Sequence, residues 1–294
     1  MTDSPPTFRT EMRFAIVGAG RVGVSFGALL QRKGHRIIGC SGRSLGALDR
    51  AVSYLGCQSS TDSAEIIEGA DAILISVPDD SLAAAAEKLA SSVAAGTVVV
   101  HASGSTGVQV LKPLEEKGAF TIAAHVLQSV PDVETGIKRI PDSWFGVTCA
   151  PSLRSWAEAF VSSLDGRVFW VDEQRRTRYH AAAAVASNYL VALSSLVERV
   201  GGDLEPYLPL MRATLENVAE LGVEKALTGP IARGDIGTVE AHLKNIADSD
   251  GEIAVLYRAL GREALRLATN RGMDEDMSNQ MRALLEEDRE VEQD

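Results

Sequence analysis

The sequence predicts an α/β fold in which a doubly wound, mostly parallel sheet precedes a second, all-helical domain. Three observations predict this fold. Up to about residue 150, short apolar runs alternate with helix-favouring segments, which is typical of βαβ units. The runs are almost continuously apolar, as expected for strands covered on both faces. After about residue 175, nearly every segment favours helix.

The predicted elements divide the chain into three parts. Residues 1–12 are expected to be a disordered extension, residues 13–172 the sheet domain, and residues 173–290 the helical domain, which we expect to bind substrate and to dimerise. The expected strands are residues 13–18, 35–40, 71–77, 96–102, 118–125 and 144–150. Between them we expect helices that include residues 21–33, 44–54 and 80–94.

Composition restricts the class of partner. The formal net charge is -11 and only 5% of residues are aromatic, which argues against nucleic-acid binding because that requires basic side chains and stacking surfaces. The three cysteines form no CxxC pair and predict neither a metal site nor disulfides. No apolar run approaches the ~18 residues that a membrane span needs, and the N-terminus lacks a signal peptide. These features predict a cytoplasmic protein without a membrane partner.

A glycine-rich turn follows the first expected strand and opens the first helix. In this turn, GAGRVG, Gly18 permits the tight turn, Gly20 lets the backbone approach a pyrophosphate, and Gly23 lets the helix pack against the sheet. The free N–H groups of the helix N-terminus favour an anion there. A Rossmann-type dinucleotide site is therefore predicted, formed by Gly18, Ala19, Gly20, Arg21, Val22 and Gly23.

The end of the second strand favours NADP (NADPH) over NAD. An NAD site places a carboxylate about 20 residues after the first glycines to hold the ribose, yet residues 37–48 contain none. Instead Ser41, Arg43 and Ser44 occupy this turn, and an Arg matches a 2′-phosphate. The alternative is that Arg43 is a solvated loop residue.

Further candidates follow three later strands. The carboxyl ends of the strands line the ligand crevice in such sheets, so Val77, Pro78 and His101 are expected beside the cofactor. Ser103 is a catalytic candidate, and His125 and Gln128 are candidates for substrate binding. Structural, hydrogen-bonded histidines remain the alternative reading, and Asp79 or Asp80 is expected to cap the next helix.

The helical part adds three candidates. His180, Ala184 and Asn188 are four residues apart and therefore share one helix face. We expect His180 to move a proton and Asn188 to orient a substrate oxygen, although Asn188 could simply bond to backbone. Arg233, in ALTGPIARGD, is a candidate for binding a substrate carboxylate, although Pro230 and Asp235 explain that segment as helix-start signals alone.

Six motifs carry a resemblance to a known family: GAGRVG, HASGSTG, HVLQSV, YHAAAAVASNYLVAL, LMRATLENV and ALTGPIARGD. From about residue 12 to 270 the chain resembles oxidoreductases that join a Rossmann-like domain to a C-terminal domain of unknown function 2520. The family has a proline where this chain has Val126. More distantly, the chain is similar to ketopantoate reductase, pyrroline-5-carboxylate reductase and the β-hydroxyacid dehydrogenases, a resemblance that implies a homodimer.

Many of those distant relatives carry a lysine four residues before an asparagine. This chain has Ala184 before Asn188, so the lysine mechanism is not carried over and His180 is expected to replace it. The leading hypothesis is an NADPH-dependent reductase of a small carbonyl compound, with ketopantoate as the first candidate substrate. Alternatives are an imine reductase, a dehydrogenase working oxidatively, a deazaflavin-linked NADP oxidoreductase, a non-catalytic NADP(H)-binding regulator, and a mainly structural oligomer.

Overall fold

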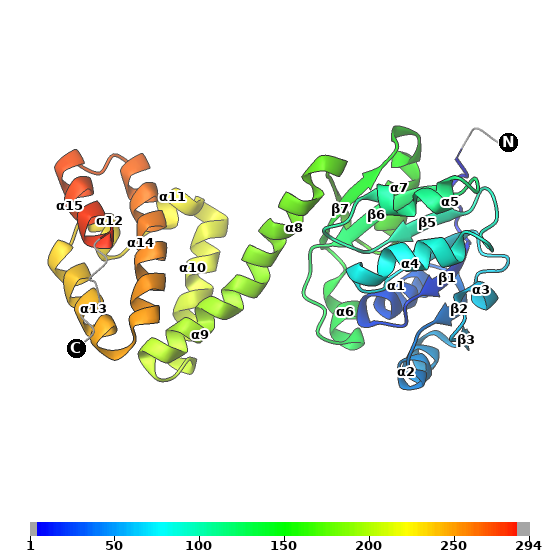
Figure 1. Cartoon of the computed structure of the whole chain (residues 1–294), viewed down its shortest axis with the longest axis horizontal. Helices are drawn as coiled ribbons and strands as arrows, with labels where there is room; N and C mark the ends of the chain where they lie inside the picture. Colours follow the sequence, from blue (N-terminus) through cyan, green and yellow to red (C-terminus); the bar gives the residue numbers. More distant parts are fainter. Residues whose placement is uncertain (1–4, 287–294) are drawn as a thin grey trace. The chain divides into compact units, whose positions relative to one another are not determined.

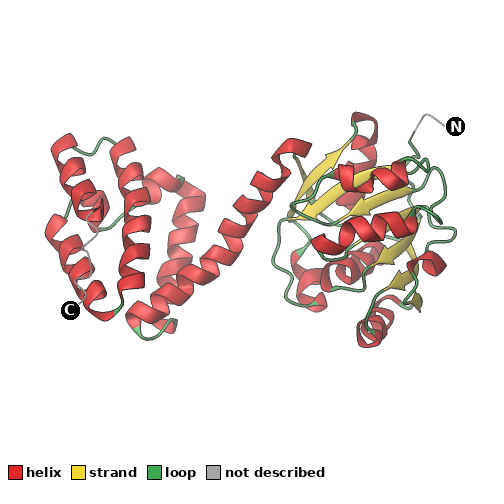
Figure 2. Ribbon diagram, in the orientation of Figure 1, coloured by secondary structure: helices red, strands yellow, loops and turns green. Residues whose placement is uncertain are grey.

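The computed structural model describes residues 5–286 and divides into two units (Figures 1 and 2). The first unit ends at Ser187 and the second begins at Asn188. The division lies later than the expected boundary at residues 172 and 173. The reason is that the first turns of the long helix after the sheet contact the sheet itself through Arg176 and Tyr179.

The first unit is built on one eight-stranded sheet in the order β3-β2-β1-β4-β5-β6-β7-β8. Every neighbouring pair is parallel except β6 with β7. This confirms the predicted α/β fold with its mostly parallel sheet. The strands are β1 Arg13–Val17, β2 Arg36–Ser41, β3 Gln58–Ser60, β4 Ala72–Ile75, β5 Val98–His101, β6 Phe120–Val126, β7 Trp144–Cys149 and β8 Arg167–Trp170.

Two strands were not among those expected. β3 is short and contains only polar residues, Gln58–Ser60, so it has no apolar signal. β8, at Arg167–Trp170, lies just before the expected end of the sheet domain, where no strand was predicted. Both lie at the edges of the sheet, where one side of a strand is unpaired and burial is lower.

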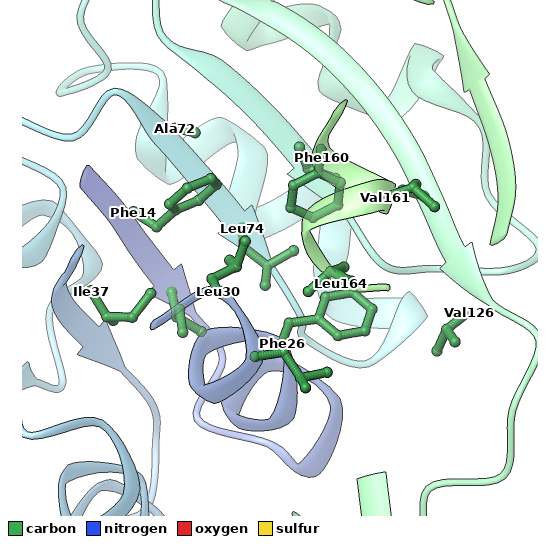
Figure 3. Packing of buried hydrophobic residues seen from close by; sticks show 14 of the residues in the cluster. Phe14, Phe26, Leu30, Ile37, Ala72, Leu74, Val126, Phe160, Val161 and Leu164 are labelled. Atoms are coloured by element: carbon green, nitrogen blue, oxygen red, sulfur yellow. The ribbon is translucent and has the colours of Figure 1, made fainter. Parts of the chain in front are cut away.

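Helices cover both faces of this sheet. On one face, Phe26 and Leu30 of α1 and Phe160 of α7 pack against Phe14 of β1 and Leu74 of β4 (Figure 3). On the other face, residues of α4 and α5 pack against alternate residues of β1, β4 and β5. The helices of this unit are α1 Arg21–Arg32, α2 Leu45–Leu55, α3 Ser63–Ile66, α4 Asp79–Leu89, α5 Lys112–Glu115, α6 Val133–Arg139, α7 Arg154–Ser163 and α8 Arg176–Ala184.

The second unit is helical, as predicted. Its main core joins Val239 and Leu243 of α13 to Leu265 of α14 and to Met281 and Leu285 of α15. Its helices are α9 Leu190–Gly201, α10 Leu208–Leu221, α11 Val223–Ala226, α12 Pro230–Arg233, α13 Ile236–Ser249, α14 Gly251–Asn270 and α15 Glu275–Glu286.

One continuous helix, Glu173–Gly201, includes α8, a π-helical turn at Val185–Tyr189, and α9. By length and by a window hydropathy of 1.4, this helix reaches what a membrane-spanning helix needs. Ser187 and Asn188 interrupt the apolar run in this helix, but its alanines still raise the mean hydropathy of the window. A single such helix is weak grounds for a membrane span.

Candidate active site

The first glycine of GAGRVG forms the tight turn at the end of β1. Gly18 has a φ of 110°, a backbone conformation that residues other than glycine rarely adopt. Its N–H donates to the carbonyl oxygen of Ser41 at 2.9 Å. A Cβ at Gly18 would clash with the carbonyl of Ser76, which follows β4. The turn therefore requires glycine and ties together the ends of β1, β2 and β4.

The other two glycines differ in what surrounds them. A Cβ at Gly23 would lie 2.8 Å from the carbonyl oxygen of Gly18 and 2.9 Å from Cβ of Ser76. Helix α1 therefore lies too close to these two residues for any side chain at position 23. Gly20 is exposed, and a Cβ there would meet only the carbonyl oxygen of Ser76 at 3.7 Å. Gly20 is also the N-cap of α1 and provides no capping side chain. Free N–H groups and open space therefore coincide, as a bound pyrophosphate requires.

The remaining residues of the turn act through their backbone or through packing. Ala19 is buried and Val22 is half-buried. The Arg21 guanidinium donates through Nη1 to the carbonyl oxygen of Pro131 at 3.0 Å, so this side chain is tied to the loop after β6.

The end of β2 presents a free cation. Ser41 is buried, and its hydroxyl lies 3.0 Å from the hydroxyl of Ser63. Arg43 and Ser44 are exposed, and among residues 5–286 no hydrogen bond or ion pair engages the Arg43 side chain. A free guanidinium beside an exposed hydroxyl, with no neighbouring carboxylate on this turn, suits a 2′-phosphate. The residues of both turns therefore fit NADP.

The carboxyl end of β4 provides an open edge. Val77 is half-buried and Pro78 is exposed there. Asp79 begins α4 but does not cap it, contrary to expectation, because its carboxylate accepts a hydrogen bond of 2.7 Å from the Ser105 hydroxyl. This bond joins the turn after β4 to the turn after β5.

The side chain of His101, predicted to lie beside the cofactor, is hydrogen-bonded within the protein. Its side chain is fully buried. The Ser103 N–H donates to Nδ1 at 3.2 Å, so the proton lies on Nε2, which donates to the carbonyl oxygen of Gly107 at 3.1 Å. Burial, followed by the charge of Arg176, lowers the pKa of His101 to about 4. The Ser103 hydroxyl, a predicted catalytic group, is also buried and accepts from the Thr106 N–H at 3.2 Å.

Two imidazoles meet at the turn after β5. His125 lies at the end of β6 and His180 on α8, with ring centroids 5.6 Å apart and an interplanar angle of 83°. Both rings lie against Gly104: a Cβ there would clash with Cδ2 of His180 and lie 3.0 Å from Nε2 of His125. The sequence analysis predicted both histidines, and the structure brings them together.

A tyrosine that the sequence analysis missed completes this cluster. The Tyr179 hydroxyl lies 2.9 Å from Nδ1 of His125, and the two rings meet edge to face. Burial of His125, then the charges of His180 and Arg176, lower the pKa of His125 to about 4. Burial raises the pKa of Tyr179 to about 12, although Arg176 opposes this shift. At neutral pH both groups are therefore uncharged.

A buried arginine lies beside this pair. Arg176 is 1% exposed. Its Nη2 donates to the carbonyl oxygen of Ser103 at 2.7 Å, and its Nη1 donates to the Thr148 hydroxyl at 3.0 Å and the Gly146 carbonyl at 3.3 Å. None of these acceptors is a carboxylate, so the charge is buried without an ion-pair partner among residues 5–286. Burial lowers the pKa of Arg176.

Three further predicted residues have other surroundings within their own units. The Gln128 amide is exposed and bonds within its own loop region, to the Arg139 carbonyl and the Ser143 hydroxyl at 3.3 Å each. Asn188 is an exposed residue of the π-helical turn, and such turns are frequent at functional sites. Arg233 lies in the second unit, where its guanidinium already pairs with Asp235 at 2.7 Å. The expected cap by Asp235 is absent for the same reason.

Comparison with known families agrees with this architecture. The model of a Rossmann-like domain matches residues 3–126, and that of a domain of unknown function (DUF2520) matches residues 143–264. The chain combines a Rossmann-like domain with a DUF2520 domain. The resemblance predicted from the sequence motifs is therefore confirmed. No curated protein matches the chain.

Solved structures share this fold. A proposed NADP oxidoreductase from Bacteroides fragilis is 23% identical, with 87% of this chain and 98% of that chain covered and a TM-score of 0.72. A protein from Thermotoga maritima is 24% identical over 88% of this chain and 100% of that chain, with a TM-score of 0.70. A reductive aminase from Aspergillus terreus, in complex with NADPH and ethyl levulinate, is 16% identical over 92% and 98% of the two chains, with a TM-score of 0.63.

Proposed function

We propose that this DUF2520 protein is an NADPH-dependent oxidoreductase that reduces a small carbonyl compound at the carboxyl edge of β4, β5 and β6. The turn at Gly18–Gly23 would hold the pyrophosphate, and Ser41, Arg43 and Ser44 the 2′-phosphate. When bound, NADPH supplies the hydride. His125 and His180 face the turn at Gly104, and one of these imidazoles supplies the proton.

The buried charge of Arg176 is the observation that favours a carbonyl substrate. A carbonyl oxygen gains negative charge as hydride is added to its carbon, and a nearby fixed cation stabilises that charge in a site that excludes water. An iminium substrate is already cationic and would be repelled by the same group. His125 and Tyr179, which lie beside Arg176, are both uncharged at neutral pH because burial lowers the pKa of His125 to about 4 and raises that of Tyr179 to about 12. Ketopantoate, an anionic keto acid, is the first candidate.

Imine reduction is the second candidate. An imine reductase from Streptomyces aurantiacus and a pyrroline-5-carboxylate reductase from Coxiella burnetii share this fold, with TM-scores of 0.63 and 0.57. A neutral imine protonated only during hydride transfer would also be compatible with the Tyr179–His125 pair. The substrate panel must therefore contain both carbonyls and imines.

The test is oxidation of NADPH by the purified protein with ketopantoate, a pyrroline carboxylate and a simple α-keto acid, each in a separate assay. Turnover on a keto acid supports the proposal, and turnover confined to the pyrroline carboxylate supports imine reduction instead. Tight NADPH binding without turnover on any of the three would contradict reduction of these compounds and favour another substrate or a non-catalytic NADP(H)-binding regulator.

A homodimer is part of the proposal. Helices α9 and α10 bury none of their residues within the described chain. Exposed apolar side chains on these two helices and on α14 include Val191, Leu210, Leu215, Val255 and Leu256. Large exposed apolar side chains of this kind are typical of an interface, and symmetric homodimers are the commonest oligomers.

Light scattering of the purified protein tests this part. A dimer without detergent, converted to monomer by Val191→Asp, supports a second copy as the occupant. A monomer that partitions into lipid vesicles would favour a membrane, because Val191, like the exposed Val185 and Val200, lies on the helix Glu173–Gly201. A cytoplasmic location is proposed on the three free cysteines, which are typical of a reducing compartment.

A further inference from the structure

The Tyr179 phenol occupies the space that a side chain at position 146 would fill. His125 of β6 pairs with Gly146 of β7 across the antiparallel ladder. A Cβ at Gly146 would clash with the hydroxyl oxygen and Cζ of Tyr179. The absence of a side chain at Gly146 therefore lets Tyr179 reach Nδ1 of His125 at 2.9 Å.

His125 connects this phenol to the turn where the reaction is proposed to occur. Its Nδ1 edge faces Tyr179, whereas its Nε2 lies against Gly104. Within residues 5–286 no protein group is hydrogen-bonded to Nε2. If Tyr179 donates to Nδ1, the proton of the neutral imidazole must lie on Nε2. The ring then presents an N–H donor toward Gly104.

Arg176 places a positive charge beside His125 and Tyr179, which are both neutral. Its Cζ lies 5.8 Å from the centroid of the Tyr179 ring, and its Nε is buried without a hydrogen-bond partner. A buried cation without a carboxylate is costly, but it stabilises any negative charge that arises beside it. The Tyr179 phenol is a group beside it that becomes negative when it loses its proton.

We propose that His125 and Tyr179 form a proton relay. The charge of Arg176 stabilises the Tyr179 phenolate that remains after the proton has been transferred. This proposal rests on the proposed carbonyl reduction. When bound, NADPH would supply the hydride for the new C–H bond, and the π electrons of the carbonyl would move to its oxygen. That oxygen takes the proton from Nε2 of His125. Nδ1 takes the Tyr179 proton, which leaves a neutral imidazole and a phenolate next to Arg176.

A route for returning the proton lies on the other side of Tyr179. A cavity of about 290 Å³ is lined by Tyr179, Phe169, Arg175 and Arg178, among other residues. The two arginines and Phe169 are exposed, so water can enter this cavity and reprotonate the phenolate. The imidazole is then left with its proton on Nδ1. After the product leaves, Nε2 gains a proton from water and Nδ1 releases its own to water, which restores the starting tautomer. In this relay His125 is the catalytic residue, and Tyr179 and Arg176 act through it.

The first readout needs no cofactor or substrate. Nitrogen NMR of protein labelled in its histidine rings reports which nitrogen of His125 carries the proton. The relay requires the proton on Nε2 in the wild-type protein and a shift toward a mixture of tautomers in Tyr179→Phe. The control is Tyr54→Phe, which removes a hydroxyl that lies 3.4 Å from Glu134 on the same unit. A proton on Nδ1 of wild-type His125 would overturn the relay.

The second readout is turnover on the best carbonyl substrate. We expect Tyr179→Phe and His125→Asn to lower kcat by about 100-fold or more, the usual contribution of a positioned proton donor, with NADPH affinity unchanged. A fluorinated tyrosine at position 179 keeps the hydroxyl and should restore both turnover and the Nε2 tautomer. Thermal unfolding checks that each variant is folded.

The outcomes separate the relay from the proposed function. If the wild-type protein reduces a carbonyl and Tyr179→Phe is as active as Tyr54→Phe, the relay is wrong and the proposed function remains. If His180→Asn abolishes turnover while His125→Asn does not, His180 is the donor and the relay is also wrong. If the wild-type protein reduces no carbonyl compound, both proposals fail.

Discussion

Nη2 of Arg176 donates to the carbonyl oxygen of Ser103 at 2.7 Å and thereby fixes the start of α8 to the turn after β5. The same guanidinium bonds to two acceptors on β7. This one side chain therefore positions Tyr179 and His180, which follow it on α8, against His125 and Gly104. The candidate site depends on a residue that makes no proposed contact with substrate.

Replacing Arg176 should affect both stability and ionisation. Arg176→Met leaves buried acceptors without donors, and unpaired buried groups cost about 1–3 kcal/mol each, so we expect a lower free energy of unfolding in denaturant. The pKa of His125 should rise because the Arg176 charge helps to depress it. Arg154→Met, which removes an exposed guanidinium lying 5.0 Å from the Trp170 ring, is the control. An unchanged His125 titration by NMR would contradict this electrostatic role.

Two glycines of the first turn should respond differently to alanine. Gly20→Ala places a methyl group in open space at an allowed φ of -84°, so the protein should fold normally and lose NADPH affinity because the methyl group blocks the pyrophosphate. Gly18→Ala forces a residue with a side chain into a φ of 110° against Ser76 and should cost on the order of 2 kcal/mol of stability. Calorimetric unfolding and NADPH titration of both variants provide the check. Equal effects of the two variants on unfolding would show that the assignment is wrong.

Arg43 should discriminate between the two nicotinamide dinucleotides. Arg43→Asp replaces a cation by a repelling carboxylate at the 2′-phosphate, so NADPH affinity should fall by about 10- to 100-fold, the range for a lost charged hydrogen bond. NADH affinity should change little. Lys117→Asp makes the same change of charge in the turn before β6 and serves as the control. Equal losses for both cofactors, or no loss for either, would place the 2′-phosphate elsewhere.

Stability should fall as the pH is lowered from about 6.5 to about 4. Burial lowers the pKa values of His101 and His125 from 6.5 to about 4, so in this range the unfolded chain binds protons that the folded chain does not. Linkage then reduces the free energy of unfolding, by up to about 3 kcal/mol for each histidine. His35, whose pKa is lowered by burial, acts in the same direction. Denaturant unfolding across this range is the measurement, and His101→Gln should flatten the dependence. A flat wild-type profile would show that these imidazoles are not buried neutral groups.

The residues that the sequence could predict are those whose roles are local. Gly18, Gly20 and Gly23 follow an apolar strand at fixed spacing, and that spacing alone specifies a turn and a helix start. The apolar runs of β1, β4 and β5 are continuous because both of their faces are buried. Patterns of this kind are present in the chain before it folds.

The residues that the sequence could not predict depend on contacts between distant segments. Arg176 and Tyr179 lie in QRRTRYH, a charged stretch that is typical of a solvated helix start. Nothing local distinguishes Arg176, which is buried, from Arg175 and Arg178, which are exposed. Conversely, His101 has the polar character of a site residue, but the 101–107 turn satisfies both of its ring nitrogens. Gly104 and Gly146 are the local features that could have indicated this cluster. Neither has a side chain, and the rings of His125, His180 and Tyr179 fill the space that a Cβ would take.

The central claim is that this chain transfers hydride from NADPH to a carbonyl carbon. The most direct measurement uses NADPH deuterated at the transferable position of its nicotinamide, with ketopantoate as the acceptor and mass spectrometry of the product. We expect one deuterium on the carbon that bears the new hydroxyl group. An unlabelled product, or bound NADPH that never loses its deuterium to any carbonyl or imine offered, would contradict it.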